Sequence, residues 1–142
     1  MAMKKVLIIL ASVFILLPVL PGCEVQKEVT FDQLFRNPGS YNGRTVSIEG
    51  FYFEGFEVVV LAEGLKNSGL VEGHIWPDGH RIWIEGGISN EIRDQMTRQN
   101  QVGPNELYGK IRVEGRFQYG ERYGHLGGYE SQIIPEQVEF IK

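Results

Sequence analysis

The chain has 142 residues, of which 42% are apolar and 23% charged, a composition that fits one globular domain and excludes an intrinsically disordered chain. Its formal net charge is −4, and an acidic balance makes it a poor general partner for nucleic acid, whose phosphates attract Lys and Arg. The 18 glycines and the 11% share of aromatic residues predict a mainly β fold with many turns between aromatic-packed strands.

The first residues have the features of a targeting segment. Lys4 and Lys5 are followed by an apolar run from Val6 to Leu20 of about 15 residues, which is short for a membrane span of roughly 20. The run ends in Leu20-Pro21-Gly22-Cys23, which contains the sole cysteine of the chain. This segment resembles the signal peptide of bacterial lipoproteins. The resemblance implies that the thiol of Cys23 receives a diacylglycerol and that cleavage occurs before it.

This interpretation divides the chain into a signal peptide (1–22), a lipidated N-terminus with a short linker (23–29) and a domain (30–142). The alternative is an uncleaved signal anchor in which Cys23 is incidental, and the short apolar run and the position of the cysteine argue against it. Without Lys4 and Lys5 the chain carries 12 basic and 18 acidic side chains, a net charge of −6.

The lipid would hold the domain at the surface of a membrane, because two or more acyl chains give stable anchoring. The lysines before the apolar run orient the domain outside the cytoplasm. We therefore expect a cell-membrane or outer-membrane protein. Glu24 follows the cysteine. An Asp at this position is associated with inner-membrane retention, so the Glu favours the outer membrane by resemblance.

The domain is expected to begin with a short helix. Thr30 and Gln33 have the spacing of a capping box, which predicts a helix that starts after Thr30. Asn37-Pro38-Gly39 ends it, and Tyr41-Asn42-Gly43-Arg44 predicts a turn in which Asn-Gly supplies a positive φ.

Two similar stretches predict the longest strands. In 45–53, apolar and polar residues alternate until Gly50 interrupts the pattern, and 111–120 repeats this order around Gly115. Each glycine suggests a bulge or a sharp bend. Two long strands with the same central bend favour a small closed barrel over a flat sheet.

The other elements are expected between and after these strands. Strand two, 57–62, is an apolar run that predicts burial on both faces. In strand three, 80–86, Ile82 and Ile84 should face inward and Trp83 outward. The remaining expectations are a long loop at 63–79, a helix at 89–99 with Ile88, Ile92 and Met96 on its buried stripe, strand four at 108–119, a hairpin loop at 120–131 and strand five at 132–140 with Pro135 at an edge or bulge.

Three strands, a helix and two strands in this order resemble the OB-fold, a five-stranded Greek-key barrel. The predicted architecture is therefore a small OB-like barrel with a short N-terminal helix and one helix between strands three and four. The segment 37–50 also resembles the start of small extracytoplasmic OB-fold lipoproteins of unassigned function. The resemblance implies that the strands with Gly50 and Gly115 pair with each other. It further implies that ligands bind on strands two and three and the flanking loops.

Five aromatic residues near these strands and loops are candidates for ligand binding. Aromatic faces with a polar tip suit sugar rings, peptides or a protein partner. The alternative is that most of them seal the barrel ends. They are Trp76, Trp83, Tyr119, Tyr123 and Tyr129, of which Trp76, Trp83, Tyr123 and Tyr129 are the preferred ligand-binding set.

The three histidines are weaker candidates for a metal site. His74 and His80 are six residues apart, which matches no standard metal-binding spacing, and His125 lies in another loop. The simpler reading is that His80 opens a strand and that His74 and His125 form hydrogen bonds within their loops. The sequence also lacks the motifs of serine hydrolases, zinc proteases and P-loop enzymes.

These features lead to one main functional hypothesis and one alternative. We expect a membrane-anchored extracytoplasmic lipoprotein, not an enzyme and without a cofactor, which binds an envelope protein or glycan and no nucleic acid. The alternative is a small metal- or cofactor-handling envelope protein that uses His74, His80 and His125.

Overall fold

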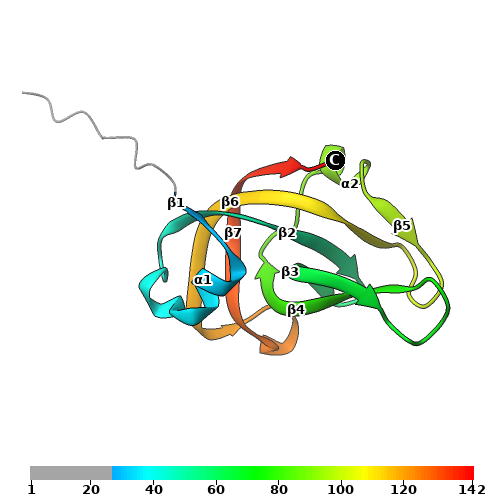
Figure 1. Ribbon diagram of the computed structural model, residues 1–142, viewed down its shortest axis with the longest axis horizontal. Helices are drawn as coiled ribbons and strands as arrows, with labels where there is room; N and C mark the ends of the chain where they lie inside the picture. Colours follow the sequence, from blue (N-terminus) through cyan, green and yellow to red (C-terminus); the bar gives the residue numbers. More distant parts are fainter. Residues whose placement is uncertain (1–26) are drawn as a thin grey trace, which may run out of the picture.

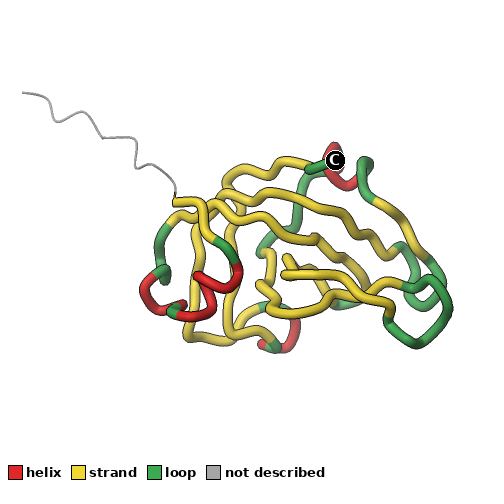
Figure 2. The backbone as a smooth tube through the Cα atoms, in the orientation of Figure 1, coloured by secondary structure: helices red, strands yellow, loops and turns green. Residues whose placement is uncertain are grey.

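The computed structural model describes residues 27–142, which fold mainly into β-strands (Figures 1 and 2). The predicted signal peptide and Cys23 lie outside the described residues. The strands are β1 (Lys27–Val29), β2 (Thr45–Gly55), β3 (Val58–Asn67), β4 (Ile75–Ile84), β5 (Thr97–Gln99), β6 (Glu106–Tyr123) and β7 (Tyr129–Phe140). The helices are α1 (Phe31–Arg36), α2 (Asn90–Arg93) and the 3₁₀ turns η1 (Pro38–Ser40) and η2 (His125–Gly127).

The strands form one mixed sheet that closes on itself. Its order is β1-β2-β3-β4-β7-β6-β5, and β2 also pairs with β6, so β2, β3, β4, β7 and β6 make a ring of five strands. The β1–β2 and β4–β7 pairs are parallel, and the others are antiparallel. In the described part of the chain, the helices are too short to cross a membrane.

The two stretches that echo each other in the sequence pair along most of their length, as predicted. The β2–β6 register runs from Thr45 opposite Arg116 to Glu54 opposite Leu107. A Cβ atom on Gly50 would lie 2.8 Å from the Phe31 ring and 2.8 Å from the Ala62 carbonyl oxygen, so glycine lets β2 pass close to α1.

The second glycine of the pair lies at a bulge. The β6–β7 register shifts between Glu114 and Gly115, and Gly115 faces Pro135. This confirms the expected bulge at Gly115 and the expected position of Pro135. A Cβ atom on Gly115 would collide with the Ile134 carbonyl group, so the close backbone approach at this bulge requires glycine.

Helix α1 covers one opening of the ring and completes the core. Thr30 Oγ1 accepts a hydrogen bond from the Gln33 backbone N–H at 3.2 Å, and Gln33 Oε1 accepts one from the Thr30 N–H at 3.1 Å. The predicted capping box is therefore confirmed. Phe31 and Leu34 are buried among the inward-facing residues of the ring, and burial of each such side chain contributes about 1.5–3 kcal/mol.

The predicted helix at 89–99 is wrong over most of its length. Only Asn90–Arg93 is α-helical, and 97–99 instead forms β5, which pairs with the start of β6. The expected apolar stripe does pack against the core, with Met96 buried and Ile88 and Ile92 partly buried. The free edge of β6 offers backbone hydrogen bonds to Thr97, a β-branched residue that favours a strand over a helix.

The strands are longer and more numerous than the sequence indicated. β3 and β4 extend through most of the segment 63–79, so the predicted long loop shrinks to 68–74, and part of the expected linker forms β1. β6 and β7 likewise shorten the 120–131 loop to 124–128. Polar and glycine-containing segments pair here because a neighbouring strand supplies their backbone partners, which their own side chains do not reveal.

Candidate functional site

Trp83 belongs to a group of aromatic residues on the outside of the ring of strands. Ile82 and Ile84 are buried and Trp83 is half-buried, as the alternation predicted. The Trp83 and Tyr129 rings lie 5.3 Å apart between centroids and are tilted by 42°. Trp83 Nε1–H donates to Glu85 Oε2 at 3.0 Å, which fixes the orientation of the indole ring.

The turn between β6 and β7 packs directly on this indole. Gly124 has φ +69°, and a Cβ atom there would lie 2.6 Å from Trp83 Cδ2 and 2.8 Å from Tyr129 Cδ2. Tyr123 faces Tyr129 across the β6–β7 pair. Three of the four preferred aromatic residues, Trp83, Tyr123 and Tyr129, therefore lie together. We call them the aromatic cluster.

Both tyrosines of the aromatic cluster are held in the neutral form. Burial raises the pKa of Tyr129 above its ordinary value of 10.0, and Arg81 opposes part of this rise. Burial, with a smaller contribution from the charge of Glu121, also raises the pKa of Tyr123. Both hydroxyls keep their protons at neutral pH and can donate hydrogen bonds to a ligand.

Two hollows lie on either side of Tyr129. The larger, of about 560 Å³, contains charged, polar and aromatic side chains and is called the groove below. The smaller has a volume of about 470 Å³ and shares Gly128, Tyr129 and Glu130 with the groove. The groove is lined by Phe35, Phe56, Glu57, Val58, Gly79, His80, Arg81, His125, Gly128, Tyr129, Glu130 and Ser131.

A histidine–glutamate contact joins two loops that line the groove. His125 Nε2 lies 3.2 Å from Glu57 Oε2, so η2 contacts the turn between β2 and β3. Phe56 is 76% exposed and Leu126 is 90% exposed. Glu57 and Leu126 have φ angles of 60° and 51°, a backbone strain that is common at functional sites. Neither Phe56 nor Leu126 was predicted as a candidate, although each is a lone large apolar residue in a polar, glycine-containing turn.

Trp76 is not part of the aromatic cluster. It lies seven residues before Trp83 on β4, which separates them by roughly 20 Å along the strand. Its ring packs against Phe53, with 5.1 Å between centroids, and lies 6.2 Å from His74. Trp76 therefore belongs to the packing of the other end of β4.

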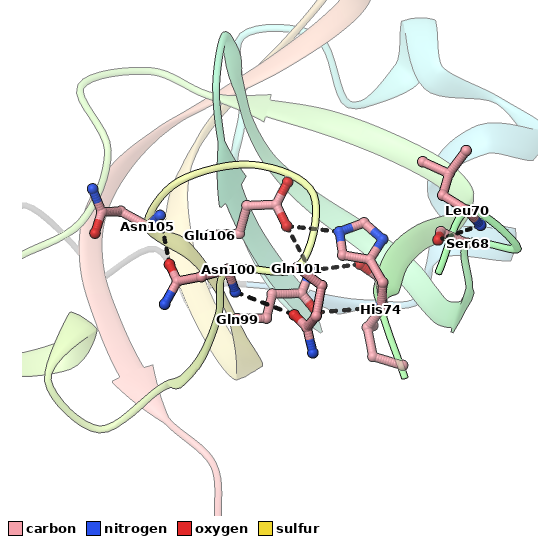
Figure 3. Close-up of polar contacts among 9 residues, drawn as sticks. Ser68, Leu70, His74, Gln99, Asn100, Gln101, Asn105 and Glu106 are labelled. Atoms are coloured by element: carbon pink, nitrogen blue, oxygen red, sulfur yellow. Dashed lines mark hydrogen bonds and ion pairs between the residues drawn. The ribbon is translucent and has the colours of Figure 1, made fainter. Parts of the chain in front are cut away.

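That end holds a buried polar network, which we call the sealed cluster (Figure 3). His74 Nε2 lies 2.7 Å from Glu106 Oε2, and Gln99 Nε2 donates to the same oxygen at 2.9 Å. Gln99 also accepts from the Ile75 N–H at 3.0 Å and donates to the Ile75 carbonyl at 2.8 Å. The three side chains come from β5, the start of β6 and the residue before β4.

The sealed cluster fastens the loops at 68–74 and 100–105 to the ring. His74, Gln99 and Glu106 are all buried, so their hydrogen bonds form away from water and are costly to break. Among the described residues, His74 Nδ1 has no hydrogen-bond partner. The hydrogen bond between His74 Nε2 and Glu106 fixes the orientation of the imidazole. No sequence pattern could link His74 to a glutamate 32 positions away.

The three histidines have separate surroundings. The backbones of His74 and His125 form hydrogen bonds within their own loops, as predicted, but their side chains lie against distant glutamates. His80 lies inside β4 and stacks on Phe35 at 4.2 Å, so the prediction that it opens a strand is wrong. Within residues 27–142, no group of three or more His, Cys, Asp or Glu side chains is arranged to hold a metal ion.

Arg112 forms ion pairs along the sheet surface that connect three strands. Arg112 on β6 contacts Glu49 of β2 at 2.5 Å and Glu139 of β7 at 3.0 Å. Lys110 and Arg112, which donate hydrogen bonds to Glu49, lower the pKa of its carboxyl below the ordinary value. On this side of the ring of strands, Arg112 therefore pairs with Glu49 and Glu139 and stabilises the sheet.

The groove beside the aromatic cluster is the candidate binding site. It combines aromatic rings with neutral hydroxyls, exposed charges and two strained loops, and it is open to solvent. Comparison of the chain with protein-family models, with curated proteins and with solved structures gave no match.

Proposed function

We propose that this protein is a lipid-anchored extracytoplasmic lipoprotein that binds an envelope protein or glycan, without catalysis, through the aromatic cluster and the groove. The observation that carries the proposal is the position of Trp83 and Tyr129 next to a solvent-open groove of about 560 Å³. Half-buried aromatic rings beside a concave polar surface suit sugar rings and protein side chains alike.

We further propose that the ring is an OB-like barrel. The closed order of five strands and the long β2–β6 pair, with Gly50 and the bulge at Gly115, support this interpretation. In such a barrel the ligand face lies on β3 and β4 between the loops that follow β2 and β6. The groove contains residues of β3, of β4 and of both loops, which agrees with that expectation.

The proposed anchor would hold the domain close to its membrane. If Cys23 carries the lipid, only three residues separate it from β1, a reach of about 10 Å. We therefore propose that a partner meets the domain near the membrane surface.

A catalytic role has less support. The histidine–glutamate pair at His74 and Glu106 resembles the base of a catalytic site, but both side chains are closed to solvent. The sequence also lacks the common hydrolase motifs. The groove itself combines side chains that suit recognition better than proton transfer.

The proposal is tested by crosslinking the full lipidated protein in its native membrane and isolating the crosslinked complexes. We expect a specific protein or glycan in the wild type and its loss in Trp83→Ala. Trp76→Ala is the matched control, because it removes a half-buried tryptophan from the same strand outside the groove. Thermal unfolding of both variants shows whether each remains folded. A partner that binds Trp83→Ala and the wild type equally well would contradict the proposal.

A further inference from the structure

The ring of strands has an opening between β4 and β7. Within residues 27–142, these strands share two pairs of facing residues, Trp83 with Gln132 and Ile84 with Ile133. If the parallel pairing continued toward the start of both strands, Arg81 would face Glu130. Instead, both residues line the groove. The groove therefore lies between two strand segments that have stopped pairing with each other.

A bulge next to β3 explains why β4 stops pairing with β7. The β3–β4 register shifts between Ala62 and Gly64, and Gly79 adopts φ +72°. Glu63 Oε2 accepts a hydrogen bond from the His80 N–H at 3.2 Å and so holds the bulged segment toward β3. Bulges bend a strand and end its pairing, which here leaves one edge of β4 and one edge of β7 facing the groove.

We propose that the groove receives an extended polypeptide segment of a protein partner, which adds to the sheet as a further strand between β4 and β7. This inference rests on the proposed binding function and selects a protein over a glycan. Strand edges present N–H and C=O groups at a spacing that an extended peptide backbone matches, whereas sugar hydroxyls do not repeat at that spacing.

The side chains around the groove indicate the sequence such a segment carries. Phe56 is 76% exposed at the mouth of the groove and offers a large apolar contact, so the segment needs an apolar residue there. Arg81 and Glu130 lie on opposite sides of the groove and favour charged residues of the complementary sign. Because residues of a strand alternate between two faces, the segment should alternate apolar and charged positions.

The test uses the full lipidated chain in detergent micelles and a displayed library of random short peptides as the probe. We expect selected peptides to bind wild type and Val102→Ala equally and Phe56→Ala about tenfold more weakly. Val102 is the matched control, because it is an apolar residue, 47% exposed, in the loop between β5 and β6. Thermal unfolding confirms that both variants fold.

N-methylation of each backbone amide of a selected peptide then tests strand addition. We expect loss of binding at consecutive residues in the centre of the peptide and none at its ends, because the amides of a strand inserted between β4 and β7 face the two edges in turn. Amides of 79–81 and 129–131 that face the groove should also exchange hydrogen more slowly in the complex, apart from the His80 N–H, which already donates to Glu63. Insensitivity to N-methylation at every position, or equal binding to Phe56→Ala, would overturn the inference.

The same micelles, probed with soluble peptidoglycan fragments, separate this inference from the proposed function. Binding of fragments that depends on Trp83, with no peptide binding in the groove, overturns the inference and leaves the proposed function standing. Concentration-dependent dimers that disappear in Phe56→Ala also overturn it, since the groove would then hold a second copy of the chain. If peptides and glycan fragments both fail to bind and no partner is crosslinked, both proposals fail.

Discussion

The protein contains two histidine–glutamate pairs of similar chemistry and very different surroundings. In the sealed cluster, the His74 and Glu106 side chains are 0% and 4% exposed, and their nitrogen and oxygen lie 2.7 Å apart. At the groove, His125 and Glu57 are 38% and 47% exposed and lie 3.2 Å apart. The first pair is closed to water and further bonded to Gln99, whereas the second shares its atoms with solvent.

The difference shows how strongly the loops at each end of β4 are held in place. A buried carboxylate must be satisfied by protein donors, so the sealed cluster fixes the loops around it into one arrangement. An exposed ion pair contributes little, because water and salt compete for both partners. The exposed contact between His125 and Glu57 can therefore break at a low cost in free energy, as a binding surface requires. The buried hydrogen bonds of the sealed cluster cannot.

Glu106→Ala gives the largest expected effect. It leaves the His74 ring and the Gln99 amide buried without their shared acceptor, and we expect the free energy of unfolding to fall by about 3 kcal/mol. Urea denaturation at neutral pH measures it. Glu57→Ala is the matched control, and its effect should stay within about 0.5 kcal/mol. Equal losses in the two variants would contradict the distinction between the pairs.

Gly73→Ala and Gly124→Ala compare the loops at the two ends of β4. Both glycines have positive φ, but a Cβ atom on Gly73 meets nothing within 4 Å, whereas one on Gly124 would collide with the Trp83 ring. We expect a loss of about 1 kcal/mol from backbone strain at Gly73 and about twice that at Gly124, where overpacking is added. Only Gly124→Ala should also shift the Trp83 fluorescence, and a shift of the same size in Gly73→Ala would refute the assigned packing.

A smaller effect is expected from Tyr129 in alkaline solution. Its pKa is raised in the folded state, so the folded protein resists ionisation that the unfolded chain undergoes near pH 10. The contribution of Tyr129 to stability is present below its unfolded pKa and is lost as the pH rises through its folded pKa. In an ultraviolet titration, Tyr129→Phe should have one tyrosine fewer than the wild type among those that ionise above pH 10. An unchanged titration curve would mean that Tyr129 is more open to water than its packing indicates.

Local patterns predicted the parts of the fold that depend on neighbouring residues. The capping box at Thr30 and the positive φ of Gly43 follow from short-range chemistry, and both are present. The alternation around Trp83 placed Ile82 and Ile84 in the core, because side chains of a strand alternate between its faces. Three of the four preferred aromatic residues lie together, whereas Trp76 packs against Phe53 at the other end of β4.

Long-range pairing decided what the sequence could not show. β5 has no apolar pattern of its own and is a strand because β6 offers it a free edge. Gln99 and Glu106 look like ordinary polar residues of a helix end and a loop, and only the fold brings them to His74. The exposed Phe56 lines a groove that forms only where η2 and the β2–β3 turn meet through His125 and Glu57.

By itself, the sequence determined that this protein is mainly β, where its longest strands lie and which side chains of β4 point inward. These properties follow from periodicity and turn chemistry, which act over a few residues. Only the tertiary structure decided that the sheet closes into a ring, that it opens between β4 and β7, and that one histidine–glutamate pair is sealed and the other exposed. Such features depend on which distant segments meet, and burial and hydrogen bonding set that outcome for the whole chain at once.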